Sequence, residues 1–267
     1  MFKFGRNWKR YLLLIDDKRI DTAKRSLKEY LAVETLSGKT FLDAGCGSGL
    51  FSLAARQLGA KALSFDIDKD SVECAKQLKM KYLPADENWA IEEGSLLDKE
   101  YLAGLGKFDI VYSWGVLHHT GRMWEAMGNV GQLVKEDGHL FIAVYNDAGK
   151  KSEQWRMIKR MYNLNVFFSI FVVIITFPYF LYSLYVYIKV IIVNIVKKNK
   201  PVISKTTRGM SRIIDWIDWI GGYPYEVAKP EEVAMFFEKR GFMLEKIKKV
   251  SSGLGNNEYV FRKLLSS

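Results

Sequence analysis

The chain has only two cysteines, Cys46 and Cys74, among its 267 residues. Two such thiols provide neither a disulfide framework nor the paired spacing of a zinc site, so we expect no metal and a reducing compartment. No internal repeat or low-complexity stretch is visible, and residues 1–17 lack the long apolar core of a signal peptide. These absences are typical of an intracellular enzyme.

The most informative motif that is present is a glycine-spaced turn, FLDAGCGSGL, at residues 41–50. An apolar strand is expected to end at Asp43, and helical spacing begins at Leu50. Glycine permits a positive φ and a close ligand approach, and a helix N-terminus offers unpaired N–H groups to a polar or anionic group. The spacing is G-x-G-x-G, which differs from the dinucleotide fingerprint G-x-G-x-x-G. The three glycines are Gly45, Gly47 and Gly49.

A second apolar strand ends in an acid, Asp66, about one βαβ unit further along. An acid at the tip of this strand can accept both hydroxyls of a ribose. Asp68 competes for this role, and its alternative interpretation is the N-cap of the next helix. Two more apolar runs, ending at EEGSLL and at FDIVYSWGVLHH, predict a third and a fourth strand.

Together these segments resemble the class I S-adenosylmethionine (SAM)-dependent methyltransferases of the small-molecule type. DAGCGSG matches the first motif of that family, FDID the second, EEGSLLD the third and FDIVYSWGVLHH the fourth. The likeness is greatest to the methyltransferases of ubiquinone and menaquinone biosynthesis, and it implies SAM as the cofactor. The fourth motif reads SWGV where enzymes that methylate base or amide nitrogens carry Asx-Pro-Pro-aromatic. O- or C-methylation of a small or lipid-like acceptor is therefore favoured.

The resemblance also implies cofactor roles for particular residues. Asp43 and the three glycines would hold the methionine part of SAM, and Asp66 would hold the ribose. The remaining cofactor candidates follow the second, third and fourth strands: Ile67, Ser95, Leu96 and Ser113. Ser95 and Leu96 would flank the adenine.

Two histidines, His118 and His119, follow the fourth strand on the cleft side. Either could act as a general base near neutral pH, with His119 slightly favoured by the resemblance. The alternative is that both bond the backbone and shape the pocket. Trp8 could cap the SAM site, or it could belong to an aromatic staple that packs on the sheet. The acceptor candidates are Trp8, Trp114, Tyr223 and Tyr225, the last two in a 216–228 loop that could equally be a rigid aromatic turn.

Strands and helices alternate along the chain. We expect strands near 40–44, 61–66, 89–94, 108–113, 138–144, 242–250 and 257–263, and helices near 21–36, 48–58, 69–82, 122–134 and 230–240. This order predicts an α/β fold: a Rossmann-like seven-stranded mostly parallel sheet with helices on both faces, plus an apolar helical insert between strand 5 and the last helix. The expected divisions are an N-terminal cap and helix (1–37), the SAM-binding core (38–148), the insert (149–212) and the C-terminal part of the core (213–267).

The insert differs in kind from the core. Residues 164–188 carry no charge, and as a straight helix they would span about 37 Å, enough for a bilayer core. Residues 150–212 hold twelve basic residues and one acid, a charge of +11 against +10 for the whole chain. The basic character therefore belongs to the insert. Because the basic residues bracket an apolar run, they favour a membrane surface over a nucleic acid as partner.

Three interpretations of residues 164–196 stay open: a membrane-surface segment, a transmembrane span, and a buried hairpin or partner interface. Strands on both sides of the insert should share one sheet, which disfavours a single crossing, and both basic flanks indicate the cytoplasmic side. We expect a shallow helical hairpin or an in-plane helix pair, bent at Pro178. The expected location is therefore cytoplasmic and membrane-associated, at the inner face.

Two other functions are weighed against the methyltransferase. A nicotinamide-dependent oxidoreductase would use the same strand–turn–helix, but Leu50 stands where its third glycine would be. A membrane adaptor that keeps the fold without catalysis would bind SAM poorly.

Overall fold

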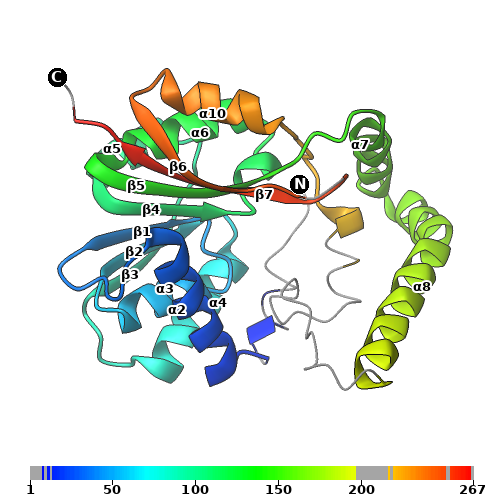
Figure 1. Cartoon of the computed structure of the whole chain (residues 1–267), viewed down its shortest axis with the longest axis horizontal. Coiled ribbons are helices and arrows are strands. Elements are labelled where there is room, and N and C mark those ends of the chain that lie inside the picture. The colour runs from blue at the N-terminus through cyan, green and yellow to red at the C-terminus, as the bar shows by residue number, and fades with distance from the viewer. Residues whose placement is uncertain are drawn as a thin grey trace.

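The computed structural model describes residues 8, 11–12, 14–196, 216, 219–250 and 253–265. Seven strands form one sheet in the order β3-β2-β1-β4-β5-β7-β6 (Figure 1). The first five pair in parallel, and β7 runs antiparallel between β5 and β6. The predicted fold is thus confirmed. The strands are β1 (Thr40–Ala44), β2 (Lys61–Asp66), β3 (Trp89–Glu93), β4 (Phe108–Trp114), β5 (Val134–Tyr145), β6 (Phe242–Lys248) and β7 (Asn256–Lys263).

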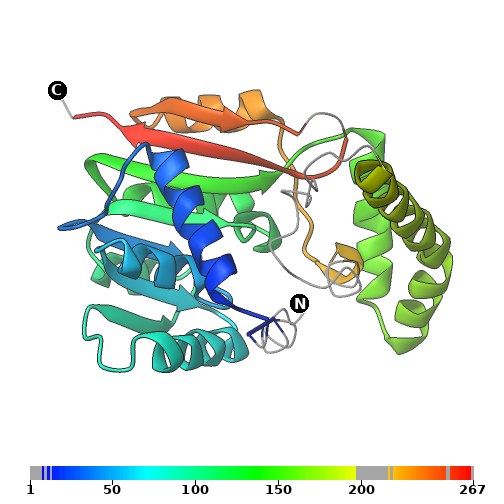
Figure 2. The ribbon, with the colours of Figure 1, turned by 60° about the horizontal axis from the view of Figure 1, so that its bottom comes forward.

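Helices cover both faces of the sheet (Figure 2). One apolar cluster joins the sheet to α2 (Asp17–Leu31), α3 (Leu50–Gln57) and α4 (Lys69–Tyr82). A second cluster, on the other face, joins it to α5 (Lys99–Gly104), α6 (Met123–Gln132) and α10 (Pro230–Glu238). A 3₁₀ turn, η1 (Leu117–His119), follows β4. Burial of both faces explains why the parallel strands are apolar almost throughout.

Helix starts follow local capping rules. Asp68 accepts a hydrogen bond from the backbone N–H of Asp70 at 2.9 Å, so it caps α4, in line with its alternative interpretation. The short helix α5 is not among the predicted helices, although Asp98 precedes it and accepts from the N–H groups of Glu100 and Tyr101.

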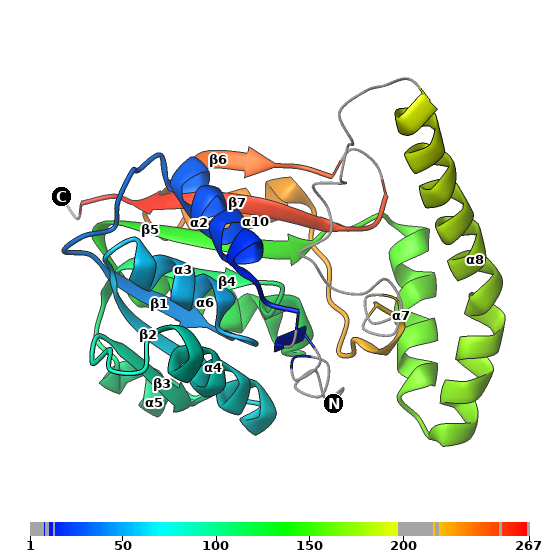
Figure 3. The ribbon, with the colours of Figure 1, turned by 90° about the horizontal axis from the view of Figure 1, so that it is seen from below.

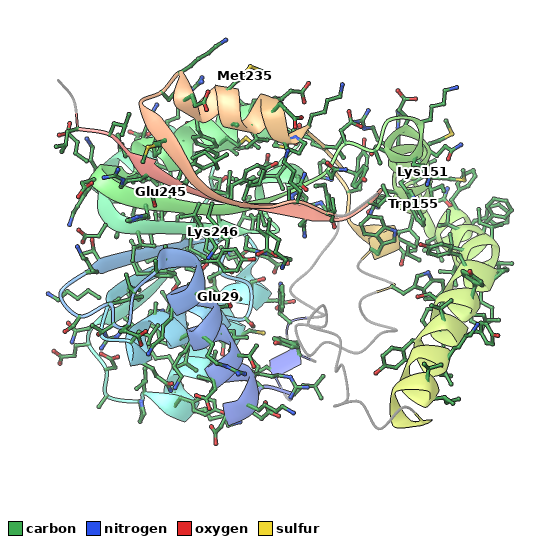
Figure 4. All side chains as sticks on the ribbon, viewed as in Figure 1. Glu29, Lys151, Trp155, Met235, Glu245 and Lys246 are labelled. Carbon is green, nitrogen blue, oxygen red and sulfur yellow. The ribbon has the colours of Figure 1, made fainter. Side chains whose placement is uncertain are left out.

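The edge strand β6 is also hydrogen-bonded to helix α2. Lys246 of β6 donates to the carbonyl of Glu29 in α2 at 2.8 Å, and both residues are labelled in Figure 4. The last strands therefore belong to the same body as α2.

The insert forms two helices, α7 (Lys150–Tyr162) and α8 (Val166–Val196), that lie side by side (Figure 3). The hairpin expected within 164–196 is wrong, because α8 continues through Pro178 as one helix. At about 1.5 Å per residue its 31 residues extend about 46 Å. The helix pair is made instead by α7 and α8. Strand β5 precedes this insert and its partner β7 follows it, so the two ends of the insert return to one sheet.

Candidate active site

The carboxyl ends of β1, β2 and β4 meet at one edge of the sheet. Asp43 of β1 is in register with Ser64 of β2 and with Tyr112 of β4. Asp66 and Ser113, each near the end of its strand, consequently lie at the same edge. Ligands of open parallel sheets bind outside this edge, and Figure 3 shows α7 and α8 standing beyond it.

The glycine turn is shaped by contacts that leave no room for side chains. Gly45 has a φ of +85°, and a Cβ built there would lie 2.5 Å from a methyl carbon of Val116. Gly47 has a φ of +53°, and its Cβ would lie 2.8 Å from the indole of Trp8. A residue with a side chain would be strained at both positions. Glycine is therefore required at both positions, because Val116 and Trp8 pack directly against the turn.

Asp66 joins the turn to the second strand. One carboxylate oxygen accepts the N–H of Gly47 at 3.0 Å and the other accepts the N–H of Asp68 at 2.9 Å. Burial raises the pKa of Asp66 to about 6, and these N–H groups oppose that rise. Each oxygen has a second lone pair, so the carboxylate can still accept ribose hydroxyls.

Asp43 is 2% exposed and is reached by a chain of donors that the sequence did not suggest. The indole N–H of Trp89 donates to Ser64 Oγ at 2.8 Å, Ser64 donates to Ser52 Oγ at 2.7 Å, and Ser52 donates to Asp43 at 2.5 Å. These groups come from β3, β2, α3 and β1. The relay holds the first acid of the motif in one orientation.

Of the other cofactor candidates, Ile67 is exposed, whereas Ser95, Leu96 and Ser113 are partly or fully buried. Ile67 is 56% exposed beside Asp66, where it can pack against a flat ligand. Leu96 is buried in the apolar cluster, and its carbonyl accepts from Asn129 at 2.7 Å. Ser95 accepts from the N–H of Leu97, and Ser113 donates to the carbonyl of Ala44. The hydroxyl of Ser113 therefore fastens β4 to β1.

Trp8 and Trp114 are both half-buried against the cluster on the α2–α3 face. The ring of Trp8 lies over Gly47 and 5.7 Å from the ring of Tyr11. This placement fits both earlier interpretations, a cap on the turn and an aromatic staple.

His118 and His119 lie beside Tyr145 at the end of β5. The ring centroids of His118 and Tyr145 are 3.8 Å apart. Neither ring nitrogen of His118 makes a well-aligned hydrogen bond to a described residue. The Ala143 carbonyl lies close enough to favour the protonated ring and so opposes the lowering of its pKa. Burial, with His119 and Lys159 nearby, holds the pKa of His118 well below its ordinary value.

His119 Nδ1 lies 2.7 Å from the carbonyl oxygen of Pro224. A carbonyl only accepts, so Nδ1 carries the hydrogen and the lone pair of the neutral ring is on Nε2. Burial lowers the pKa of His119 to about 3, the Pro224 carbonyl opposes that change, and Lys159 reinforces it. The ring is therefore neutral across the physiological range, and its low pKa makes it a weaker base than an ordinary histidine.

Lys159 of α7, counted among the basic flanks of the insert, is completely buried. Its ammonium lies 4.2 Å from the ring centroid of Trp219, 4.9 Å from Tyr225 and 5.9 Å from Tyr145, and it donates to the carbonyl of Trp219. Such aromatic faces stabilise a desolvated cation. Tyr225 is 2% exposed and forms a wall of this aromatic cage, while Tyr223 is half-buried in the same loop.

A protein-family model described as a methyltransferase domain matches residues 16–170. The chain belongs to this family. It is a SAM-dependent methyltransferase.

Individual relatives agree with that assignment. A ribosomal protein L11 methyltransferase of Helicobacter hepaticus is 33% identical over 31% of this chain and 25% of its own length. A ubiquinone biosynthesis O-methyltransferase of Mesorhizobium japonicum is 30% identical over 48% of this chain and 49% of its own. The chain thus spans between a quarter and half the length of these curated relatives.

A solved structure shares the fold. The magnesium protoporphyrin IX methyltransferase of Synechocystis PCC 6803, with bound SAM, has a TM-score of 0.53 and 15% identity, covering 91% of this chain and 79% of that one.

The described residues include no group of three or more His, Cys, Asp or Glu side chains arranged to hold a metal ion. A surface hollow of about 530 Å³ has Lys107 and Leu133 in its lining, at the amino ends of β4 and β5. It therefore lies at the opposite edge of the sheet from the glycine turn.

Proposed function

We propose that this methyltransferase transfers the methyl group to an oxygen or carbon of a lipid-like acceptor at the cytoplasmic face of a membrane. The observation that carries the proposal is the apolar surface of α8. Within Val166–Lys189 only 11% of the most apolar window is buried, and Phe167, Ile174 and Tyr182 are 73%, 64% and 65% exposed. An apolar surface of this extent normally marks an interaction site.

Charge supports a membrane as the partner. Lys151 and Arg160 are exposed on α7, and six further basic residues follow α8 in the sequence at 197–212. Basic residues on both sides of an apolar helix in the sequence are typical of attachment to anionic lipid. Because β5 and β7 share one sheet, an in-plane position of α8 keeps the whole core on one side of the membrane.

The two parts of the site suit O- or C-methylation. SAM, when bound, supplies an electrophilic methyl group on a sulfonium. In this proposal Asp43, Gly45, Gly47 and Gly49 position its methionine part and Asp66 its ribose. An acceptor hydroxyl that gains the methyl must lose a proton, and Nε2 of His119 can accept it.

Labelled methyl transfer tests the acceptor class. The full chain is incubated with methyl-labelled SAM and, separately, with a membrane lipid extract, an aqueous metabolite extract and a protein extract of the host cells. We expect chain-dependent label in the lipid extract. Label confined to the protein extract would favour the activity named for the L11 relative, and no transfer with SAM bound would favour the adaptor.

Flotation tests the membrane claim. The Ile174→Glu variant should bind vesicles of phosphatidylcholine and phosphatidylserine, mixed roughly three to one, at least about tenfold less than the native chain, because it places a charge on the exposed face of α8. The matched control is Met80→Glu, since Met80 is a 72% exposed apolar residue on α4. Equal flotation of both variants, or none by the native chain, would contradict the claim.

A further inference from the structure

Two side chains of α7 and that of its C-cap residue, Asn163, each donate to a backbone carbonyl of the 219–226 loop. Arg156 donates to Tyr225 O at 3.3 Å, Lys159 donates to Trp219 O, and Asn163 donates to Gly221 O at 2.8 Å. Their spacing, i, i+3 and i+7, places them on one stripe of the helix. We call these residues the α7 comb.

The loop that the comb holds is also the loop that orients the histidines. The Pro224 carbonyl accepts from His119 Nδ1 at 2.7 Å, and the backbone N–H of Glu226 donates to the carbonyl of His118 at 3.0 Å. The carboxylate of Glu226 also accepts from the N–H of Met123, at 3.1 and 3.2 Å, where α6 begins. The loop is therefore fixed to α7 on one side and to the histidine turn η1 on the other.

We infer that Lys159, with Arg156 and Asn163, is a positioning residue of the methyltransferase: the α7 comb sets the 219–226 loop so that the Pro224 carbonyl fixes the ring of His119. The inference rests on the proposed function of His119 as the residue that faces the acceptor. It makes α7 part of the active site as well as the start of the apolar insert.

Lys159 is buried, so its ammonium cannot act as a surface charge that attracts lipid. Its burial instead supports a role in holding the loop. A fully buried lysine is rare because its ammonium loses its hydration, and here the Trp219 carbonyl and three aromatic rings replace part of it. A methionine of similar length would keep the packing and remove the donor. The Trp219 carbonyl would then lose its contact with α7, and the loop would be held by fewer bonds.

Nitrogen NMR of ¹⁵N-histidine-labelled full-length chain tests the inference without an acceptor or a membrane. The chain has three histidines, and a His119→Gln variant identifies the signals of His119. In the native chain we expect hydrogen on Nδ1 and none on Nε2. In Lys159→Met we expect a mixture of the two tautomers, because a histidine released from Pro224 favours hydrogen on Nε2.

Two further variants complete the experiment. Asn163→Leu removes a second donor of the α7 comb and should shift the tautomer in the same direction. It provides the test if Lys159→Met does not fold. Lys151→Met is the matched control, the same substitution at an exposed position of the same helix, and it should leave the tautomer unchanged. SAM titration and thermal unfolding report whether each variant is folded.

A folded Lys159→Met or Asn163→Leu variant that keeps the native tautomer would overturn the inference. Absence of label transfer to lipid by the native chain, with the tautomer effect of the variants intact, would instead refute the proposed acceptor class. The two results are therefore distinguishable.

Discussion

The two sides of the proposed active site are built in different ways. The proposed cofactor side lies at the ends of adjacent parallel strands, and its acids, glycines and hydrogen-bond chain all fall within residues 43–89. The proposed acceptor side brings together η1, the end of β5, α7 and the 219–226 loop, from segments up to about a hundred residues apart. The first side is a property of the sheet, whereas the second depends on how the insert docks. Variants on the two sides should therefore affect different steps.

The largest separation is expected at His119. His119→Ala should lower label transfer about 100-fold and leave SAM affinity within about twofold, because in the proposed mechanism the ring accepts the proton of the acceptor and does not hold SAM. The lower end of the usual range for acid–base catalysis is expected, since a pKa of about 3 makes the ring a weak base. Transfer rates and calorimetric SAM titration measure the two effects.

His139→Ala is the control for His119→Ala. His139 carries the same side chain but is half-buried near the start of β5, 3.2 Å from Glu245, and its loss should change neither quantity. Transfer by the native chain should also show no decline from histidine protonation between pH 8 and pH 5. A fall in SAM affinity as large as the fall in transfer would place His119 on the cofactor side and break the comparison.

A smaller effect, on SAM affinity instead of methyl transfer, is expected at Asp66. The folded pKa of about 6 lies above the ordinary 3.8, so the fold favours the protonated acid. Asp66 therefore contributes stability below pH 4 that is lost as the pH rises to 6. SAM affinity should change the other way, rising about tenfold from pH 5 to pH 7, because the carboxylate is the form that accepts two ribose hydroxyls.

Calorimetry at several pH values, together with denaturant unfolding, measures both trends. Asp66→Asn should weaken SAM binding and remove both pH dependences. Asp68→Asn should keep them, because asparagine caps α4 as well as aspartate does. If Asp68→Asn removed the pH dependence instead, the ribose role would belong to Asp68.

The same contrast explains what could be predicted from sequence. Strand ends such as Asp43 and Asp66 were visible because strand, turn and helix follow one another locally and the sheet order brings the ends together. The capping role of Asp68 was visible for the same reason. Helix α5 is also predictable from sequence, because Asp98 precedes it as an N-cap.

Long-range contacts could not be predicted in this way. Lys159 stands in a basic, helical stretch, and nothing local distinguishes it from the exposed Lys151. The relay from Trp89 through Ser64 to Ser52 depends on three elements packing together. The hairpin expected at Pro178 is wrong because a proline removes one N–H from a helix without having to end it, and the apolar residues on both sides favour continuation.

The smallest effect should decide between the two interpretations of Trp8. As a cap, its indole covers Gly47 and slows the escape of SAM, so Trp8→Ala should raise the SAM dissociation rate about three- to fivefold, or about 0.7–1 kcal/mol. As a staple against Tyr11, its loss would lower the melting temperature and leave that rate unchanged. Stopped-flow release of SAM and thermal unfolding separate the two outcomes. Trp124→Ala is the matched control, because Trp124 is a 39% exposed tryptophan on α6 that contacts Phe236. A faster release in Trp8→Ala alone would extend the cofactor side to a segment that precedes the first strand.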